Sequence, residues 1–195
     1  MKTVSRAYDS YAQARSAVDA VEKAGVPTSD VSIIANKYVS AEYADVDEVS
    51  GGATGAGIGG ALGGGAGLLA GLGLLAIPGL GPVVAAGWLA STAVGAVAGA
   101  AAGGIVGALV DAGVDRKHAD IYSEAIRRGG TLVTARVRDE DADRVDAILA
   151  EYEPIDPAIR GDEYRKEGWA TFDPKAEPYR PSQVEIDRIR ANWPG

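Results

Sequence analysis

The chain has 195 residues, no cysteine, and a formal net charge of −8 at pH 7. Without cysteine it has no disulfide framework, thiolate metal site or cysteine nucleophile. The acidic balance, with no cluster of lysine and arginine, argues against a nucleic-acid-binding protein. The N-terminus lacks the apolar core of a signal peptide, so we expect the chain to begin in the cytoplasm of a bacterium-like cell.

Residues 1–49 predict the first half of a small α/β domain. Residues 2–8 are a candidate strand, and residues 10–24 carry an apolar stripe at helical spacing that ends at Gly25 and Pro27. The sequence DVSIIANK contains a second strand, residues 31–35. This half therefore has the order strand, helix, strand.

An uncharged block follows: 60 positions, residues 51–110, contain no charged side chain. Small residues recur in it at four-residue spacing, which places them along one side of a helix. Such stripes let two helix backbones approach closely. We predict that these residues form helix contacts: Gly51, Gly55, Gly59, Gly63, Gly67, Gly71, Gly87, Ser91, Gly95, Gly99, Gly103 and Gly107.

The sequence IPGLGP divides the block and predicts a tight turn, because two prolines and two glycines interrupt any helix. The turn residues are Pro78, Gly79, Gly81 and Pro82. We therefore predict a long helical hairpin over residues 50–112, with one helix at residues 51–76 and the other at residues 83–112.

Neither predicted helix has a polar face, so both must be buried on all sides. Lipid could cover them, because each exceeds the roughly 20 residues that a membrane span needs. The nearby lysines and arginines would then place both termini in the cytoplasm, with the hairpin in the inner membrane. The alternative is a soluble cytoplasmic homo-oligomer, a scaffold or shell, with the hairpins at its core. The expected partners are thus further copies of the chain and a lipid bilayer.

Residues 113–156 predict the second half of the α/β domain. A helix is expected at residues 118–128 and another at residues 141–152. Between them, residues 131–138 alternate apolar and polar, which is typical of a strand buried on one face. The sequence EPID could add a last strand. The predicted fold class is α+β, a ferredoxin-like βαβ…βαβ sandwich split by the inserted apolar glycine-zipper hairpin and followed by an extended C-terminal tail.

Several stretches resemble the bacterial general stress protein family, also called the heat-induced stress protein family. They are IPGLGPVVAAG, AIRRGGTLVTARV, DADRVDAILAEY and YEPIDPAIRGDEYRKEGW, and the resemblance covers about residues 1–169. It implies a stress-associated bacterial protein, and it carries no catalytic residues over to this chain.

Residues 157–195 predict an extended tail with one short helix at residues 182–191, because Ser182 and Glu185 have the spacing of a capping box. Its aromatic side chains are candidate anchors, since tryptophan and tyrosine are common at interfaces. They could dock on the chain's own domain or on a neighbouring copy. The anchors are Trp169, Phe172, Tyr179 and Trp193.

We expect no enzyme and no cofactor. Gly55, Gly57 and Gly60 spell a dinucleotide-binding pattern, but neither the strand before it nor the acidic residue after it is present. His118 is the only histidine, too few for a typical zinc site. The acidic run Asp139, Glu140, Asp141 and Asp143 could bind a hard cation, although acidic residues also favour helix N-termini. The third hypothesis for function is therefore a small-ligand or cation sensor.

Overall fold

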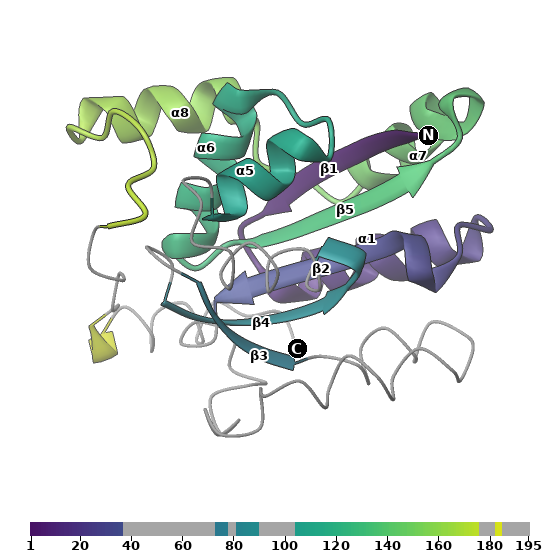
Figure 1. The fold of residues 1–195 in the computed structure, drawn as a ribbon, viewed down its shortest axis with the longest axis horizontal. Helices are drawn as coiled ribbons and strands as arrows, with labels where there is room; N and C mark the ends of the chain where they lie inside the picture. The colour runs from purple at the N-terminus through teal and green to yellow at the C-terminus, as the bar shows by residue number, and fades with distance from the viewer. Residues whose placement is uncertain (37–72, 78–80, 90–103, 176–181, 185–195) are drawn as a thin grey trace.

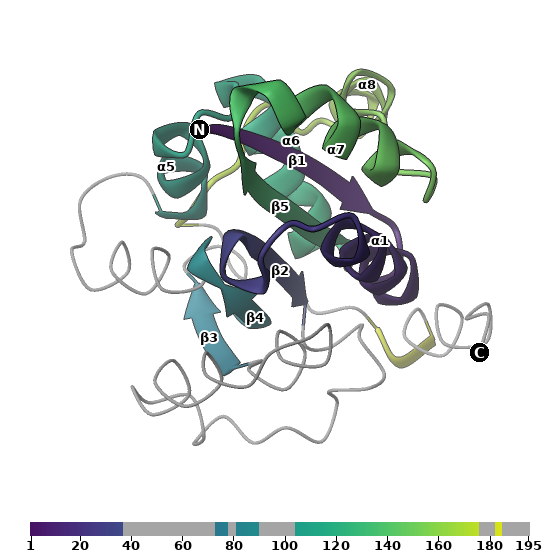
Figure 2. The same ribbon diagram turned by 90° about the vertical axis from the view of Figure 1, so that its right-hand side faces the viewer.

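The computed structural model describes residues 1–36, 73–77, 81–89, 104–175 and 182–184. These form a mixed α/β fold with one antiparallel sheet between two layers of helices (Figures 1 and 2). The strands are β1 Lys2–Tyr8, β2 Val31–Asn36, β3 Gly73–Ile77, β4 Gly81–Gly87 and β5 Thr131–Val137. The helices are α1 Tyr11–Lys23, α5 Gly104–Asp111, α6 Arg116–Arg127, α7 Ala142–Ala150 and α8 Pro157–Lys166, with 3₁₀ turns at Thr28–Asp30 and Asp139–Asp141.

The sheet has the order β1-β5-β2-β4-β3, and every neighbouring pair is antiparallel. β1 and β2 both run opposite to β5, which lies between them, so α1 joins two parallel strands that are not direct neighbours. Apart from the possible strand at EPID, the predicted strands and helices of the two flanks are thus confirmed, with ends within two residues of the prediction.

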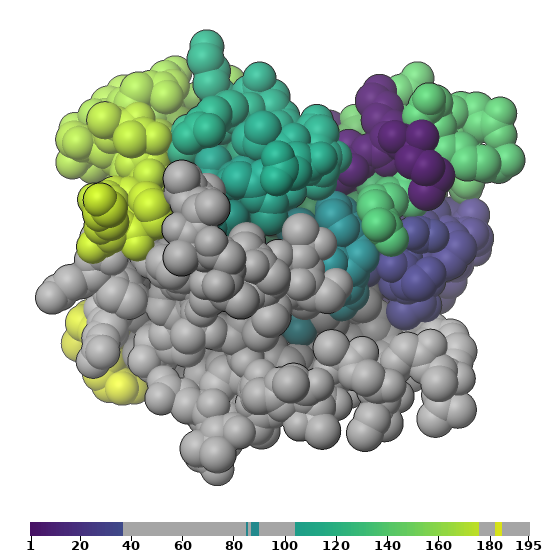
Figure 3. All heavy atoms as spheres, viewed as in Figure 1, coloured from purple at the N-terminus to yellow at the C-terminus, as the bar shows by residue number. Residues whose placement is uncertain are grey.

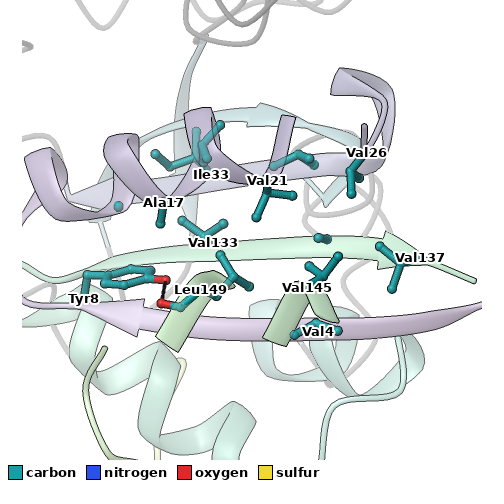
Figure 4. Close-up of a cluster of buried hydrophobic side chains, with 14 of the residues drawn as sticks. Val4, Tyr8, Ala17, Val21, Val26, Ile33, Val133, Val137, Val145 and Leu149 are labelled. Atoms are coloured by element: carbon teal, nitrogen blue, oxygen red, sulfur yellow. Dashed lines mark hydrogen bonds between the residues drawn. The ribbon is translucent and has the colours of Figure 1, made fainter. Parts of the chain in front are cut away.

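The first hydrophobic cluster lies between the sheet and the pair α1 and α7. Figure 4 shows valines of the sheet, α1 and α7 together in this cluster. At one end of it, the carbonyl of Leu149 accepts a hydrogen bond of 2.9 Å from the Tyr8 hydroxyl. α1 begins where it was predicted because Ser10 and Gln13 form a capping box.

The second cluster covers the opposite face of the sheet and contains side chains of α5, α6 and the residues around α8. β5 is therefore buried on both faces, with Leu132 and Val133 both fully buried. The predicted half-buried strand is wrong on this point, because the second cluster covers Leu132 and Thr134 is buried too; Arg136, on the same face, stays partly exposed.

The predicted helical hairpin is wrong at residues 73–77 and 81–87, which are strands. The register runs without interruption from Ser32 opposite Gly87 to Asn36 opposite Val83. A short apolar run cannot be assigned to helix or strand from its periodicity, and here β2 offers an edge with which it pairs. Of the predicted second helix, α5 is present at Gly104–Asp111. Residues 51–72 lie outside the described residues.

The C-terminal region also differs from the prediction, because α8 occupies the start of the predicted extended tail. Asp156 caps this helix by accepting bonds from the backbone N–H groups of Ala158 and Ile159, and Pro157 holds its first position. The sequence EPID forms no strand, but the backbone N–H of Ile155 donates to the carbonyl of Ala7 on β1, at 2.7 Å.

Candidate functional site

The structure describes two of the predicted helix-contact residues, Gly87 and Gly107, and the other ten lie outside the described residues. Gly87 ends β4, and Gly107 lies in α5. Of the predicted turn residues, Gly81 and Pro82 belong to β4. The remaining positions lie outside the described residues: Gly51, Gly55, Gly59, Gly63, Gly67, Gly71, Ser91, Gly95, Gly99 and Gly103, together with Pro78 and Gly79 of the turn.

Gly87 is required by a strand contact and not by the predicted helix contact. Its φ of +86° lies in the left-handed region, and a Cβ atom there would be 2.1 Å from the carbonyl oxygen of Val31. Any side chain would therefore push β4 away from β2.

Gly107 has the opposite surroundings. A Cβ atom at this position would meet no atom within 4 Å among the described parts of the chain, apart from its own helix. α5 nevertheless packs firmly by another side, on which Ile105 and Leu109 are buried. The Gly107 side of α5 is thus a place where a second backbone could approach closely.

A cluster of charged and aromatic side chains joins the end of α6 to α8. Glu124 is 1% exposed and accepts bonds from Arg127, at 2.6 and 2.8 Å, and from Arg128, at 2.7 Å. The Arg128 guanidinium also donates to Glu167 and lies 4.2 Å above the centre of the Tyr164 ring. A hydrogen bond from Asn36 to the carbonyl of Arg127 connects this cluster to the end of β2.

Two of the predicted tail anchors are described, and both contact their own chain. Trp169 packs edge-on against Tyr164, with ring centres 5.7 Å apart. Phe172 is 6% exposed and belongs to the second hydrophobic cluster. Figure 3 shows the surface of α8 and the following residues adjoining that of α6. Tyr179 and Trp193 lie outside the described residues.

Three of the acidic groups considered as cation ligands, Asp139, Glu140 and Asp141, form ion pairs with other groups. Arg138 pairs with Glu140 and Asp141, while Asp139 contacts the N-terminal amine. His118 is exposed in the first turn of α6 and faces the Tyr122 ring at 6.1 Å. Among the described residues, no group of three or more potential ligands could hold a metal ion.

Burial raises the pKa of the three tyrosines Tyr8, Tyr122 and Tyr164. Tyr122 donates to the carbonyl of Ser5 at 3.2 Å, in the same way that Tyr8 bonds to Leu149. The hydroxyls of Tyr8 and Tyr122 are buried and bond to the backbone, so they act as structural donors rather than as acids.

A shallow depression of about 390 Å³ lies between the start of α1 and the end of α7. Gln13 and Ser16 line one side, and Glu151, Tyr152 and Glu153 line the other. It is open and formed by surface residues, and it brings together none of the residues that the sequence analysis selected.

Comparison of the chain with protein-family models, with curated proteins and with solved structures found no match. Among the described helices, none combines the length and the apolar character needed to cross a membrane. The sequence analysis missed the Glu124 cluster. Its only signal is one glutamate followed by two arginines at helical spacing, a pattern that is common on exposed helix surfaces.

Proposed function

We propose that this protein is a non-enzymatic, stress-associated bacterial protein that self-assembles through its uncharged block. The observation that carries the proposal is the absence of charge from residues 51–110. One copy of a small α/β domain offers limited surface to bury such a block, so we expect further copies to cover it. The space beside Gly107, which none of the described residues fills, supports helix contacts between copies.

The domain that carries the block is proposed to be a split ferredoxin-like unit. Three features support this topology: β5 lies between β1 and β2, α1 and α7 share one face, and Ile155 bonds to the free side of β1. A fourth strand of that fold would lie where Ile155 lies. The resemblance to the general stress protein family agrees with this proposal.

The pairing of β4 with β2 supports an assembly in which the middle of the block stays on the domain. The pairing of β3 with β4 therefore favours a location of this part of the block on the domain rather than across a bilayer. We therefore favour the soluble homo-oligomer. Insertion in the inner membrane, with both termini in the cytoplasm, is the second candidate, favoured by the length of the uncharged sequence.

Light scattering of the full chain in detergent-free buffer tests self-assembly. We expect particles many times the chain mass of 19.9 kDa. A well-folded monodisperse monomer would refute the proposal. Cell fractionation separates the two candidates, because a membrane protein stays with the pellet after an alkaline wash, whereas a soluble assembly is released.

Substitution of Gly107 by leucine tests the role of the predicted contacts. The described residues leave room for the leucine side chain within one copy, but this side chain would hold apart helices that meet at position 107. We expect less assembly with unchanged circular dichroism. Ala158→Leu, at an exposed position of α8, controls for added apolar surface. If both variants assemble like the parent, the Gly107 side of α5 is not a contact between copies.

A further inference from the structure

The two edges of the sheet differ in how their backbone groups are satisfied. At the β1 edge, groups from outside the sheet bond to two carbonyls: the Tyr122 hydroxyl to Ser5, and the backbone N–H of Ile155 to Ala7. β3 forms the other edge, and no strand in the described parts of the chain pairs with its outer side. Figure 2 shows the two edge strands on opposite sides of the sheet.

β3 also lacks the features that usually prevent an edge strand from pairing further. Its sequence, GLLAI, has no charged residue and no proline. Its register with β4 runs without a bulge from Gly73 opposite Ala85 to Ile77 opposite Gly81. β1, in contrast, carries Lys2 and Arg6. Charges, prolines and bulges are the common devices that block edge pairing, so β3 is suited to accept another strand.

We infer that β3 pairs with β3 of a second copy, antiparallel about a twofold axis, so that the two sheets become continuous. This inference rests on the proposed self-assembly and specifies one of its contacts.

Three observations favour a second copy as the occupant. Every pairing in the sheet is antiparallel, and a twofold axis through β3 adds another antiparallel neighbour. The strand is uncharged, so two copies do not repel each other. β4 fixes β3 to the domain through β2, and a fixed strand pairs with less loss of conformational freedom than an unpaired segment does.

A cysteine scan of the full-length protein tests the inference, because the natural chain contains no cysteine. Leu74→Cys, Leu75→Cys and Ala76→Cys are compared singly under mild oxidation. At the residue on the twofold axis, the two Cα atoms would lie about 4.5–5.5 Å apart, within disulfide range. We expect one position to give a disulfide-linked dimer about tenfold faster than its neighbours. Ser16→Cys, on the exposed side of α1, is the control.

Equal rates at all three positions, or none above that of Ser16→Cys, would overturn the inference. Circular dichroism and the particle size of each variant establish that it folds and assembles like the parent. A lysine beside the best cysteine then provides an independent test, introduced as Leu75→Lys or, where position 75 carries the best cysteine, as Leu74→Lys. The charge should abolish the specific cross-link, while the circular dichroism stays unchanged.

The outcome also separates this inference from the proposed function. If the parent assembles but no β3 cysteine cross-links specifically, β3 pairs with another segment or with none, and self-assembly through the uncharged block stands. If the parent is a monomer, both fail.

Discussion

At the scale of single residues, Glu124 is the buried charge on which the α6–α8 contact depends. Its carboxylate balances the charge of two half-buried guanidinium groups, those of Arg127 and Arg128. The Arg128 guanidinium also donates to Glu167 and lies over the Tyr164 ring. A buried carboxylate is costly unless it is fully paired, and here its oxygens accept three hydrogen bonds. The cluster therefore makes the end of α6 and the end of α8 dependent on each other.

Replacing Glu124 by alanine should lower the free energy of unfolding by about 3 kcal/mol, because two guanidinium groups lose their common partner. Chemical denaturation followed by circular dichroism measures the loss. Glu163→Ala is the matched control: this exposed glutamate pairs with Arg160 three residues away, and its loss should cost less than about 1 kcal/mol. Equal losses in the two variants would show that burial of Glu124 adds nothing.

The buried tyrosines predict that stability falls in alkaline solution. Burial raises the pKa of Tyr8, Tyr122 and Tyr164 above the ordinary value of 10.0, so the folded chain holds these protons more tightly than the unfolded chain. Their contribution is complete below pH 10.0 and is lost as the pH rises through the folded values. Each tyrosine then lowers the free energy of unfolding by up to about 1.4 kcal/mol per pH unit.

Denaturation at a series of pH values measures this dependence. Tyr8→Phe should make the decline above pH 10.0 shallower, since one of the three groups no longer titrates. An unchanged slope in the phenylalanine variant would contradict the assignment.

At the scale of elements, β4 joins the uncharged block to the domain, and Gly87 permits its close approach to β2. We predict that Gly87→Ala destabilises the chain by about 2 kcal/mol or more, because the left-handed backbone and the Val31 carbonyl both exclude a Cβ atom. Thermal melting provides the measurement. Gly107→Ala should instead be neutral or stabilising, because the space is open and alanine favours a helix. A harmless Gly87→Ala would argue against the pairing of β4 with β2.

α8 and the residues around it form a second structural element that the chain needs. Ile155, Tyr164 and Phe172 are buried, and Arg160 forms two bonds to Asp9, at 2.8 and 2.9 Å. Each large apolar side chain contributes roughly 1.5–3 kcal/mol when buried. These residues therefore belong to the domain and not to a separate tail.

Truncation after residue 152 should lower the melting temperature by about 10 °C or more, from the burial that is lost. Truncation after residue 175 keeps all three buried side chains and should melt within a few degrees of the parent. If the two truncations melt alike, the contacts of α8 add little stability.

At the scale of the whole molecule, the uncharged block is not a separate insertion as far as its described parts show. Leu89, Ile105 and Leu109 are buried in the second hydrophobic cluster, between the sheet and α6. The domain boundary predicted at residue 112 therefore cuts through a core, because α5 covers the same face of the sheet as α6.

Two replacements by a Gly/Ser linker test this organisation. Replacing residues 51–112 removes α5 and β4 and exposes the second cluster, so we expect loss of the cooperative thermal transition. Replacing residues 51–71 keeps every described element and should preserve mixed α/β circular dichroism. A folded domain from the larger replacement would show that the block is a true insertion, and an unfolded chain from the smaller one would show that residues 51–71 are required for folding.

The sequence by itself determined the elements of the two flanks and their order. These elements follow from local signals that act over a few residues and can therefore be recognised in the sequence alone. Examples are helix caps such as Ser10 with Gln13, glycines after helices, and apolar residues at regular spacing. The sequence also shows the uncharged block, since charge needs no structural context. The start of α8 also has a local signal, because Asp156 and Pro157 form a typical helix start, although an extended tail was predicted there.

Only the tertiary structure decided what depends on distant partners. The periodicity of the short apolar run at residues 81–87 does not distinguish a helix from a strand, and pairing with the edge of β2 decides for the strand. The need for glycine at position 87 comes from the Val31 carbonyl, 56 positions away in the sequence. The burial of both faces of β5, and of Glu124 among arginines, follows from helices that meet only after folding. Local propensity cannot encode such contacts, because their free energy appears only when the two surfaces come together.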